Sequence, residues 1–437
     1  MKLRRTNLAA ITFIALGFGG CTSEPSGSVT PTTPGLKAFI GARIIIDGSR
    51  VVESGVIIVQ DGRITEVGEA ETVTVPADAE RVDLTGRVVV PGFINTHGHV
   101  GATRGLESSQ DLYTRDNLLR QLDLYARYGV TTVFSLGNDD KIGLDLRDEQ
   151  HANPLSRARL FVAGPVLNPS TPEEARIAVD EVANMGVDIV KIRVDDNLGS
   201  TTKMPEAVYR AVIDQAHERG LRVAAHLFYL DDAKALVKAG VDFLAHSIRD
   251  ADVDQELINL MVEQNICLTP TLLREVSTFV YESRPNFFDD PFFLQHVDPD
   301  VLTQLEDPER QVQVQNSSSA QQYKAALDIA MRNVKALADG GVRIAFGTDT
   351  GPVGRFQGYF EQLELERMVD AGLTAEQVLV TATRDAAACM QTEDVGTLEA
   401  GKWADLLVLS ADPLDDILNT RAIESVWIAG NQIPTLN

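Results

Sequence analysis

Eight short apolar segments in the middle of the chain, separated by helix-like segments, constrain the fold most strongly. Each is short enough for a buried strand, whereas the segments between them, such as 172–186 and 204–220, show the spacing of amphipathic helices. Eight strands that alternate with helices over about 300 residues are typical of a (β/α)8 TIM-like barrel. An open doubly wound sheet is the alternative, but the first strand lacks the glycine-rich phosphate turn of that fold. The eight segments are 88–97, 129–137, 159–164, 187–194, 221–226, 241–246, 266–272 and 342–349.

The two ends of the chain share a different, strand-rich pattern. Residues 36–90 contain the turn dipeptides Asp47-Gly48 and Asp61-Gly62 between apolar stretches, which favour hairpins. Residues 390–437 repeat this pattern. We therefore predict a small β-sandwich domain built from 36–90 and 390–437, with an α/β barrel at 91–389 inserted between its halves.

One long segment interrupts the barrel pattern. Residues 273–325 separate the seventh strand from the helix before the eighth, and are much longer than a usual loop. Because loops after barrel strands surround the active-site mouth, the insertion is either a lid or substrate wall, or a helical pair that packs on the barrel flank. Its aromatic residues are Phe279, Tyr281, Phe287, Phe288, Phe292 and Phe293.

The N-terminus has the features of an export signal. Residues 1–20 combine a basic start with an apolar run of eleven residues, which suits a signal peptide but is too short to cross a bilayer. Gly19-Gly20-Cys21 resembles a bacterial lipobox, so we expect lipidation at Cys21. Residues 22–35, rich in Ser, Thr, Pro and Gly, read as a disordered tether. The expected location is the cell envelope, on the periplasmic face of a bacterial membrane, as an outer-membrane lipoprotein.

The number of cysteines bears on disulfides, and the net charge bears on binding partners. Beyond Cys21 only Cys267 and Cys389 are present, too few for a disulfide framework, and we expect both to be small buried hydrophobic residues. The formal net charge of -24 argues against nucleic acid as a partner, because phosphate binding needs a basic surface. A small molecule is the expected ligand. The oligomeric state is not readable from the sequence.

Imidazole and carboxylate groups stand at the ends of the strand-like segments. His97 and His99 are two residues apart, so on a strand both side chains point to one face. The fifth, sixth and eighth segments end in His226, His246 and Asp349. Barrel enzymes carry their chemistry at these strand ends, and divalent metals such as zinc bind this set of nitrogen and oxygen donors. A single histidine of this kind is more often a core residue; five at consistent positions indicate a metal site.

Lys191 lies in the middle of the apolar segment 187–194. A buried ammonium without a partner is costly, so such a lysine is usually paired, neutral or chemically modified. Its position on the fourth strand directs it toward the same end of the barrel as the histidines.

These residues together resemble the amidohydrolase superfamily, in its imidazolonepropionase-like and prolidase-like branch. The motifs are HGH at 97–99, KIR at 191–193, AAH ending at His226, LAH ending at His246, and GTD ending at Asp349. The resemblance covers residues 36–437. It implies two divalent ions, with zinc the expected metal, bridged by Lys191 carboxylated by CO2. It also implies His97, His99 and Asp349 at the more buried ion, and His226 and His246 at the other.

The implied reaction is hydrolysis of a carbon–nitrogen bond. A hydroxide between the ions would attack a carbonyl, and Asp349 would carry the proton to the leaving nitrogen. The expected substrate is a small, rather apolar N-acyl amino acid or dipeptide; Tyr229 and Arg193 are candidate substrate contacts, with packing and a structural salt bridge as their alternatives. A cyclic-amide or lactone hydrolase on the same ions is the alternative enzyme. A catalytically inactive surface binding protein is the alternative of another class, which a complete ligand set disfavours.

Overall fold

The computed structural model describes residues 33–151 and 155–434. Cys21, the predicted signal segment and most of the predicted tether lie outside these residues. Within the described part, no helix has the length and apolar character needed to cross a membrane.

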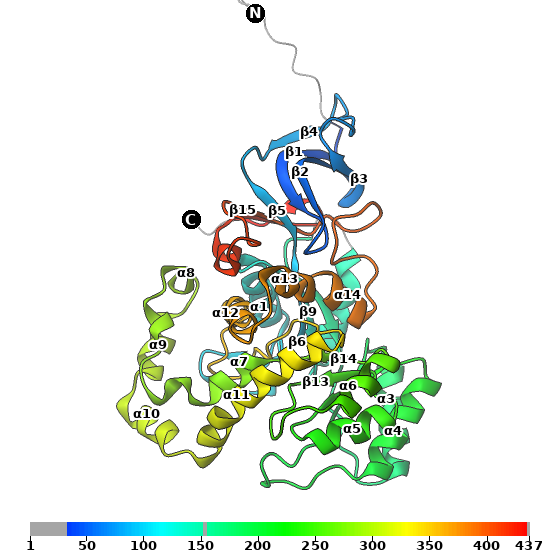
Figure 1. Cartoon of the computed structure of the whole chain (residues 1–437), viewed down its shortest axis with the longest axis vertical. Helices are drawn as coiled ribbons and strands as arrows, with labels where there is room; N and C mark the ends of the chain where they lie inside the picture. Colours follow the sequence, from blue (N-terminus) through cyan, green and yellow to red (C-terminus); the bar gives the residue numbers. More distant parts are fainter. Residues whose placement is uncertain (1–32, 152–154, 435–437) are drawn as a thin grey trace, which may run out of the picture.

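Strands from both ends of the chain share one eight-stranded sheet, at the top of Figure 1. Its order is β17-β16-β15-β5-β1-β2-β3, and β4 pairs with β1. The predicted small β domain assembled from both termini is confirmed, because Val89 of β5 pairs with Val408 of β15. The strands are β1 (Leu36–Ile45), β2 (Val51–Gln60), β3 (Arg63–Glu69), β4 (Glu80–Asp83), β5 (Val88–Pro91), β15 (Leu406–Leu409), β16 (Ile423–Ile428) and β17 (Asn431–Gln432).

The middle of the chain forms the predicted barrel. Within the described residues its parallel strands are β6 (Phe93–Gly98), β9 (Val130–Ser135), β10 (Arg159–Val162), β11 (Val190–Arg193), β12 (Val223–His226), β13 (Phe243–Ala245) and β14 (Cys267–Thr269). The covering helices include α1 (Arg115–Arg127), α2 (Lys141–Asp148), α3 (Pro172–Met185), α4 (Glu206–Glu218), α5 (Leu230–Lys238), α6 (Gln255–Glu263), α12 (Tyr359–Asp370), α13 (Ala375–Ala382) and α14 (Arg384–Met390).

Two of the predicted strands differ from the structure. The first, 88–97, is split into β5, which belongs to the small sheet, and β6, which belongs to the barrel. Pro91-Gly92 lies at the split, and Gly92 N donates to Asp405 O of the small domain. The eighth, 342–349, is not a regular strand but joins its neighbours through isolated bridges, Leu268 with Ile344 and Gly98 with Thr350.

Helix α3 shows how the local sequence determines where an element begins, where it ends and which face it buries. Thr171 caps the helix by accepting from Glu174 N, and Pro172 occupies the first turn, where its missing N–H costs nothing. The helix ends at Gly186 in the left-handed region, which glycine adopts without strain. Ala175, Val179 and Val182 recur at helical spacing and are buried.

The insertion is helical and packs its aromatic residues into the body of the molecule. Phe288 and Phe293 are buried, and the Phe293 ring lies 4.6 Å from that of Tyr359 and 4.8 Å from that of Phe356. This geometry favours packing over a lid for these aromatic residues. The insertion comprises α7 (Leu272–Phe279), α8 (Pro291–Leu294), α9 (Pro299–Leu305), α10 (Pro308–Gln315) and the start of α11 (Ser318–Asp339), visible on one side of Figure 1.

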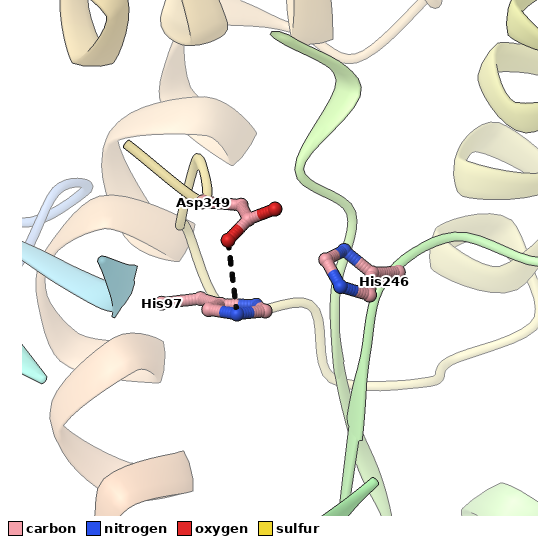
Figure 2. A group of neighbouring side chains, drawn as sticks. All are labelled: His97, His246 and Asp349. Carbon is pink, nitrogen blue, oxygen red and sulfur yellow. Dashed lines mark ion pairs between the residues drawn. The ribbon is translucent and has the colours of Figure 1, made fainter. Parts of the chain in front are cut away.

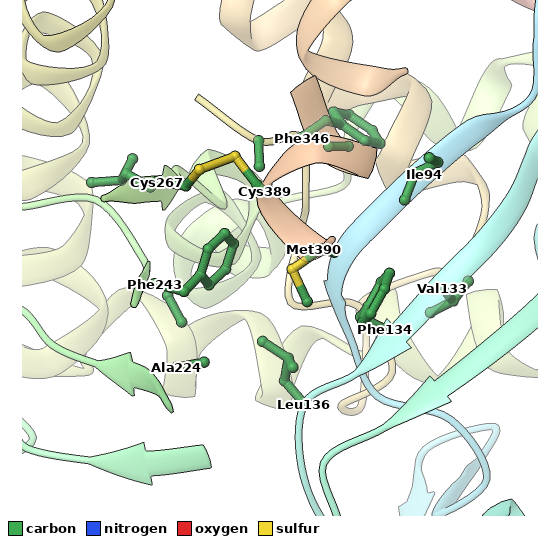
Figure 3. Close-up of a cluster of buried hydrophobic side chains, with 14 of the residues drawn as sticks. Ile94, Val133, Phe134, Leu136, Ala224, Phe243, Cys267, Phe346, Cys389 and Met390 are labelled. Carbon is green, nitrogen blue, oxygen red and sulfur yellow. A yellow bond between two sulfur atoms is a disulfide. The ribbon is translucent and has the colours of Figure 1, made fainter. Parts of the chain in front are cut away.

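Cys267 and Cys389 form a disulfide, so the expectation of two unpaired thiols is wrong. Their Cα atoms lie 5.9 Å apart, although 122 residues separate them in sequence. Both are buried as expected, in the core where β14 meets α14 (Figure 3). The pairing follows from the barrel topology, which brings the seventh strand against the last helix, and not from the spacing of the cysteines.

Candidate metal centre

His97, His246 and Asp349 lie together at the carboxyl ends of the barrel strands (Figure 2). One donor atom from each lies within 4.8 Å of the others, and all three residues are buried. His97 Nε2 is 3.5 Å from Asp349 Oδ1, and the rings of His97 and His246 are 4.6 Å apart. Two imidazoles and a carboxylate at this spacing are a donor set for a divalent metal.

The backbone at this site is held in uncommon conformations. Asp349 has φ 60° and His246 has φ 142°, a region that non-glycine residues seldom adopt. Asp349 N donates to His97 O at 2.6 Å, which holds the end of the eighth barrel segment against β6. Gly351 has φ 113°, and a Cβ there would lie 2.1 Å from His99 O. Strained residues of this kind cluster at functional sites because the surrounding structure must hold them.

Lys191 reaches the same group from β11. Its side chain is buried, and its Nζ lies 3.2 Å from His97 Nε2. Burial lowers the pKa of Lys191 to about 7; Asp349 opposes this shift and Arg193 adds to it. A substantial fraction of the amine is therefore neutral near pH 7, and the neutral amine is the form that reacts with CO2.

His99 and His226 flank the central three residues. His99 Nε2 is 2.9 Å from Asp349 Oδ1, and its Nδ1 is 3.2 Å from Gly137 O. The His226 ring packs 4.2 Å from that of His246, while its Nε2 is 3.2 Å from Asp195 Oδ2. All six predicted ligands thus lie in one neighbourhood, and their assignment to individual ions stays a prediction.

The protonation states of the site suit metal binding. Burial lowers the pKa of His97 and His246 well below the usual value, and lowers that of His226 to about 4. Burial opposes ionisation of Asp349, but Arg355 and the nearby histidines hold its pKa well below its usual range. Neutral imidazoles and an ionised carboxylate are the forms that bind a cation.

One buried ring nitrogen of His246 is suited to bind a cation. His246 Nδ1 is 2.7 Å from the hydroxyl of Thr271, and His246 Nε2 is buried without a hydrogen-bond partner among the described residues. With Nδ1–H donating to Thr271, the lone pair of Nε2 is free toward His97 and Asp349. Such a fixed tautomer is how proteins orient metal-binding histidines.

Several supporting residues were missed by sequence reasoning. Thr271 orients His246, Asp195 contacts His226, and Arg355 pairs with Asp349. Buried Glu361 accepts from Asn95 Nδ2 and Thr348 Oγ1, both at 2.6 Å, and so ties β6 to the segment that carries Asp349. Asp195 and Arg355 lie within six residues of a predicted ligand, which is the one signal that the sequence carried.

The two candidate substrate contacts have partners within the protein. The Tyr229 hydroxyl donates to Asp196 Oδ1 at 2.8 Å, and Arg193 Nε donates to Asp195 Oδ1 at 2.9 Å. The second contact is the structural salt bridge that was the alternative for Arg193. A role for either side chain in substrate binding stays a prediction.

Fold and site together define a barrel protein with a buried cluster suited to a metal. Comparison with known proteins identifies the class: residues 88–433 match the family described as "Amidohydrolase family". The chain belongs to this family, and His97, His246 and Asp349 are consistent with a metal-dependent member.

Individual relatives are distant. The chain is 28% identical over 223 residues to an uncharacterized protein of Mycobacterium tuberculosis, a match that covers 49% of this chain and 56% of that protein. It therefore spans little more than half the length of this curated relative. Imidazolonepropionase of Streptomyces avermitilis is 24% identical, with 98% of this chain and 95% of that protein covered. Among solved structures, the chain resembles a Bifidobacterium longum protein assigned as a prolidase, with a TM-score of 0.74 and 26% sequence identity. The match covers 92% of this chain and 95% of that protein.

Proposed function

We propose that the protein is a metal-dependent amidohydrolase with two metal ions, which cleaves the amide bond of a small, rather apolar N-acyl amino acid or dipeptide. The observation that carries the proposal is Lys191, a buried lysine with a lowered pKa, 3.2 Å from His97 in a cluster of metal-binding side chains. A site for one ion has no need of a buried amine, whereas a carboxylated lysine would supply the anion that two neighbouring cations require.

Each side chain has a defined part in this proposal. His97, His99 and Asp349 would hold one ion and His226 and His246 the other, with carboxylated Lys191 between them. Zinc is the metal that this donor set suits. Bound ions would acidify a water molecule and polarise the amide carbonyl. Asp349 is ionised at neutral pH, so it is available to accept the proton of the water and pass it to the leaving nitrogen.

A cyclic-amide or lactone hydrolase is the second candidate. The similarity to an imidazolonepropionase over nearly the whole chain favours it. The buried lysine favours the first candidate, because it points to a bridged pair of ions. An inactive binding protein is disfavoured by the number of costly buried ionisable groups kept at the site.

The experiment that tests the proposal combines metal analysis with a substrate panel. We expect close to two divalent ions per purified chain, and turnover of N-acyl amino acids or dipeptides that a chelator abolishes and added zinc restores. Turnover of cyclic imides or lactones alone would select the second candidate. Absence of chelator-sensitive turnover on the whole panel would contradict both.

Export and lipid anchoring through Cys21 are also proposed. The disulfide between Cys267 and Cys389 supports a location outside the cytoplasm, because disulfides persist in oxidising compartments. Labelling of cells with radioactive palmitate, in wild type and Cys21→Ala, tests the anchor.

A further inference from the structure

A second group of buried charged residues lies beside the metal centre, over the fifth to seventh barrel strands. This arginine cluster consists of Arg249, Arg274, Glu275 and Tyr323. Arg249 follows His246 by three residues, Arg274 and Glu275 lie in the first turn of α7, and Tyr323 belongs to α11. The cluster therefore joins the barrel to the insertion.

One carboxylate serves two guanidinium groups in the cluster. Arg274 Nη1 is 3.1 Å from Glu275 Oε2, and Arg249 Nε is 3.0 Å from Glu275 Oε1. Arg274 Nη2 donates to the Tyr323 hydroxyl at 3.2 Å. In the described part of the chain, no other carboxylate forms an ion pair with either arginine. Within the cluster, two guanidinium groups thus share one carboxylate, which leaves a net charge of +1 on these side chains.

The positive charge is buried and incompletely bonded. Arg249 is 1% exposed and Arg274 7% exposed, so water does not solvate them freely. Arg274 Nε and Arg249 Nη2 have no hydrogen-bond partner among residues 33–151 and 155–434. Unpaired buried charges with unsatisfied donors are unfavourable, and native proteins retain them where a ligand completes the group. An anion with oxygen acceptors would satisfy these donors, because guanidinium is its preferred partner.

Backbone connections place this cluster next to the metal centre. Thr271, which contacts His246, precedes Arg274 by three residues. Arg249 Nη1 donates to Leu227 O, adjacent in sequence to His226. The Arg249 guanidinium also lies over the Phe228 ring, 4.7 Å from its centre. Arg249 also lines a cavity of about 320 Å³, together with Phe228, Tyr229 and Ile329.

We propose that Arg274, assisted by Tyr323, binds the carboxylate of the substrate, while Glu275 and Arg249 act as positioning residues that hold the Arg274 guanidinium. This assignment rests on the proposed amide hydrolysis and identifies the side chains that would recognise the free carboxylate of the proposed N-acyl amino acid or dipeptide. It assigns the anion contact to Arg274 in place of Arg193, whose guanidinium is already paired with Asp195.

The test measures binding of a matched pair of ligands to the metal-loaded protein. N-methylsulfonyl-L-leucine carries the carboxylate but has a sulfonamide that resists hydrolysis, and its carboxamide is the neutral counterpart. Isothermal titration of Arg274→Gln should show affinity for the acid reduced by about 30-fold or more, with affinity for the carboxamide changed by less than about 3-fold. Tyr323→Phe should lower affinity for the acid by about 3- to 10-fold. Arg332→Gln, exposed on α11, is the matched control and should bind both as wild type does.

Several outcomes would overturn the assignment. The first is equal affinity of the wild type for the acid and the carboxamide. The second is an equal loss of affinity for both ligands in Arg274→Gln. The third is no loss of affinity for the acid in either Arg274→Gln or Tyr323→Phe. If Arg274→Gln does not fold, as judged by circular dichroism, the Tyr323→Phe result decides. Selective binding of the acid without turnover of any amide would support the carboxylate site and contradict the proposed hydrolysis, so the two failures are distinguishable.

Discussion

The hydroxyl of Thr271 lies 2.7 Å from Nδ1 of His246 and leaves the other nitrogen of that ring facing the metal centre. Thr271→Val keeps the shape of the side chain and removes the hydroxyl. We expect zinc affinity to fall by about 10- to 100-fold, because the ring loses the contact that fixes its tautomer. Competition against a chromophoric chelator measures this affinity. Thr271→Ser, which keeps the hydroxyl, should stay within about 3-fold of wild type, and equal losses in both variants would contradict the explanation.

Lys191→Ala tests the bridge between the ions. We expect metal content to fall from about two ions to one or fewer per chain, and hydrolysis to fall by at least about 100-fold. Short carboxylic acids such as acetate or propionate should restore part of both, because they can replace the lost carbamate. Carbon-13 NMR after exposure to labelled CO2 should show a carbamate signal in wild type and in the surface control Lys238→Ala, and none in Lys191→Ala. Full activity of Lys191→Ala would exclude a bridging role.

Asp139 should make the fold less stable as pH rises. Burial raises its pKa from 3.8 to about 7 in the folded protein, despite a 2.5 Å hydrogen bond from Ser135. Between these pH values Asp139 ionises in the unfolded chain and stays protonated in the folded protein. The contribution of Asp139 to stability is therefore fully present below pH about 4 and falls by up to about 4 kcal/mol toward pH 7.

Asp139→Asn should remove this part of the pH dependence. The amide oxygen can accept from Ala163 N, and the amide nitrogen can donate to the Ser135 hydroxyl. Urea unfolding at several pH values between 4 and 8, with a chelator in every sample, measures the difference from wild type. Buried Glu361 titrates in the same range, which is why the difference between proteins is compared. If the unfolding free energy has the same pH dependence in the two proteins, Asp139 does not titrate between pH 4 and 8.

The Cys267–Cys389 disulfide should contribute to stability by restricting the unfolded chain. Because the cysteines are 122 positions apart in sequence, we expect the double variant Cys267→Ala, Cys389→Ala to lose about 4 kcal/mol of unfolding free energy. Denaturant unfolding with and without dithiothreitol checks this. The reductant should lower the stability of wild type and leave the double variant unchanged; insensitivity of wild type to complete reduction would refute the expectation.

Sequence patterns predicted the barrel and the composite sheet because apolar runs of strand length report burial directly. The predicted metal ligands were selected for the same reason: His226, His246 and Asp349 each end an apolar run, and His246 and Asp349 lie together with His97 in the structure. The split between β5 and β6 was not predictable, because Val88 to Ile94 is apolar on both sides of Gly92 and the change of sheet depends on contacts with β15. The eighth barrel segment pairs through isolated bridges, and the positive φ of Asp349 breaks the extended backbone at its end.

Contacts between distant segments were the other part that the pattern could not supply. Thr271 belongs to the predicted seventh strand, and nothing in the sequence shows that the fold brings it to His246. Arg274 reads as one charge in a helix, and its significance depends on Arg249 and Tyr323, which are 25 and 49 residues away along the chain. The disulfide is the same case at longer range.

The composite sheet also sets the order in which the molecule can be completed. Strands β1 to β3 are made early, but β5 has its antiparallel neighbour only when β15 arrives, more than 300 residues later. During synthesis the edge of β5 therefore stays unpaired until the whole barrel has been made. Unpaired strand edges can associate with other chains. A chain that crosses a membrane unfolded would reach its final form only after its last strands have passed through.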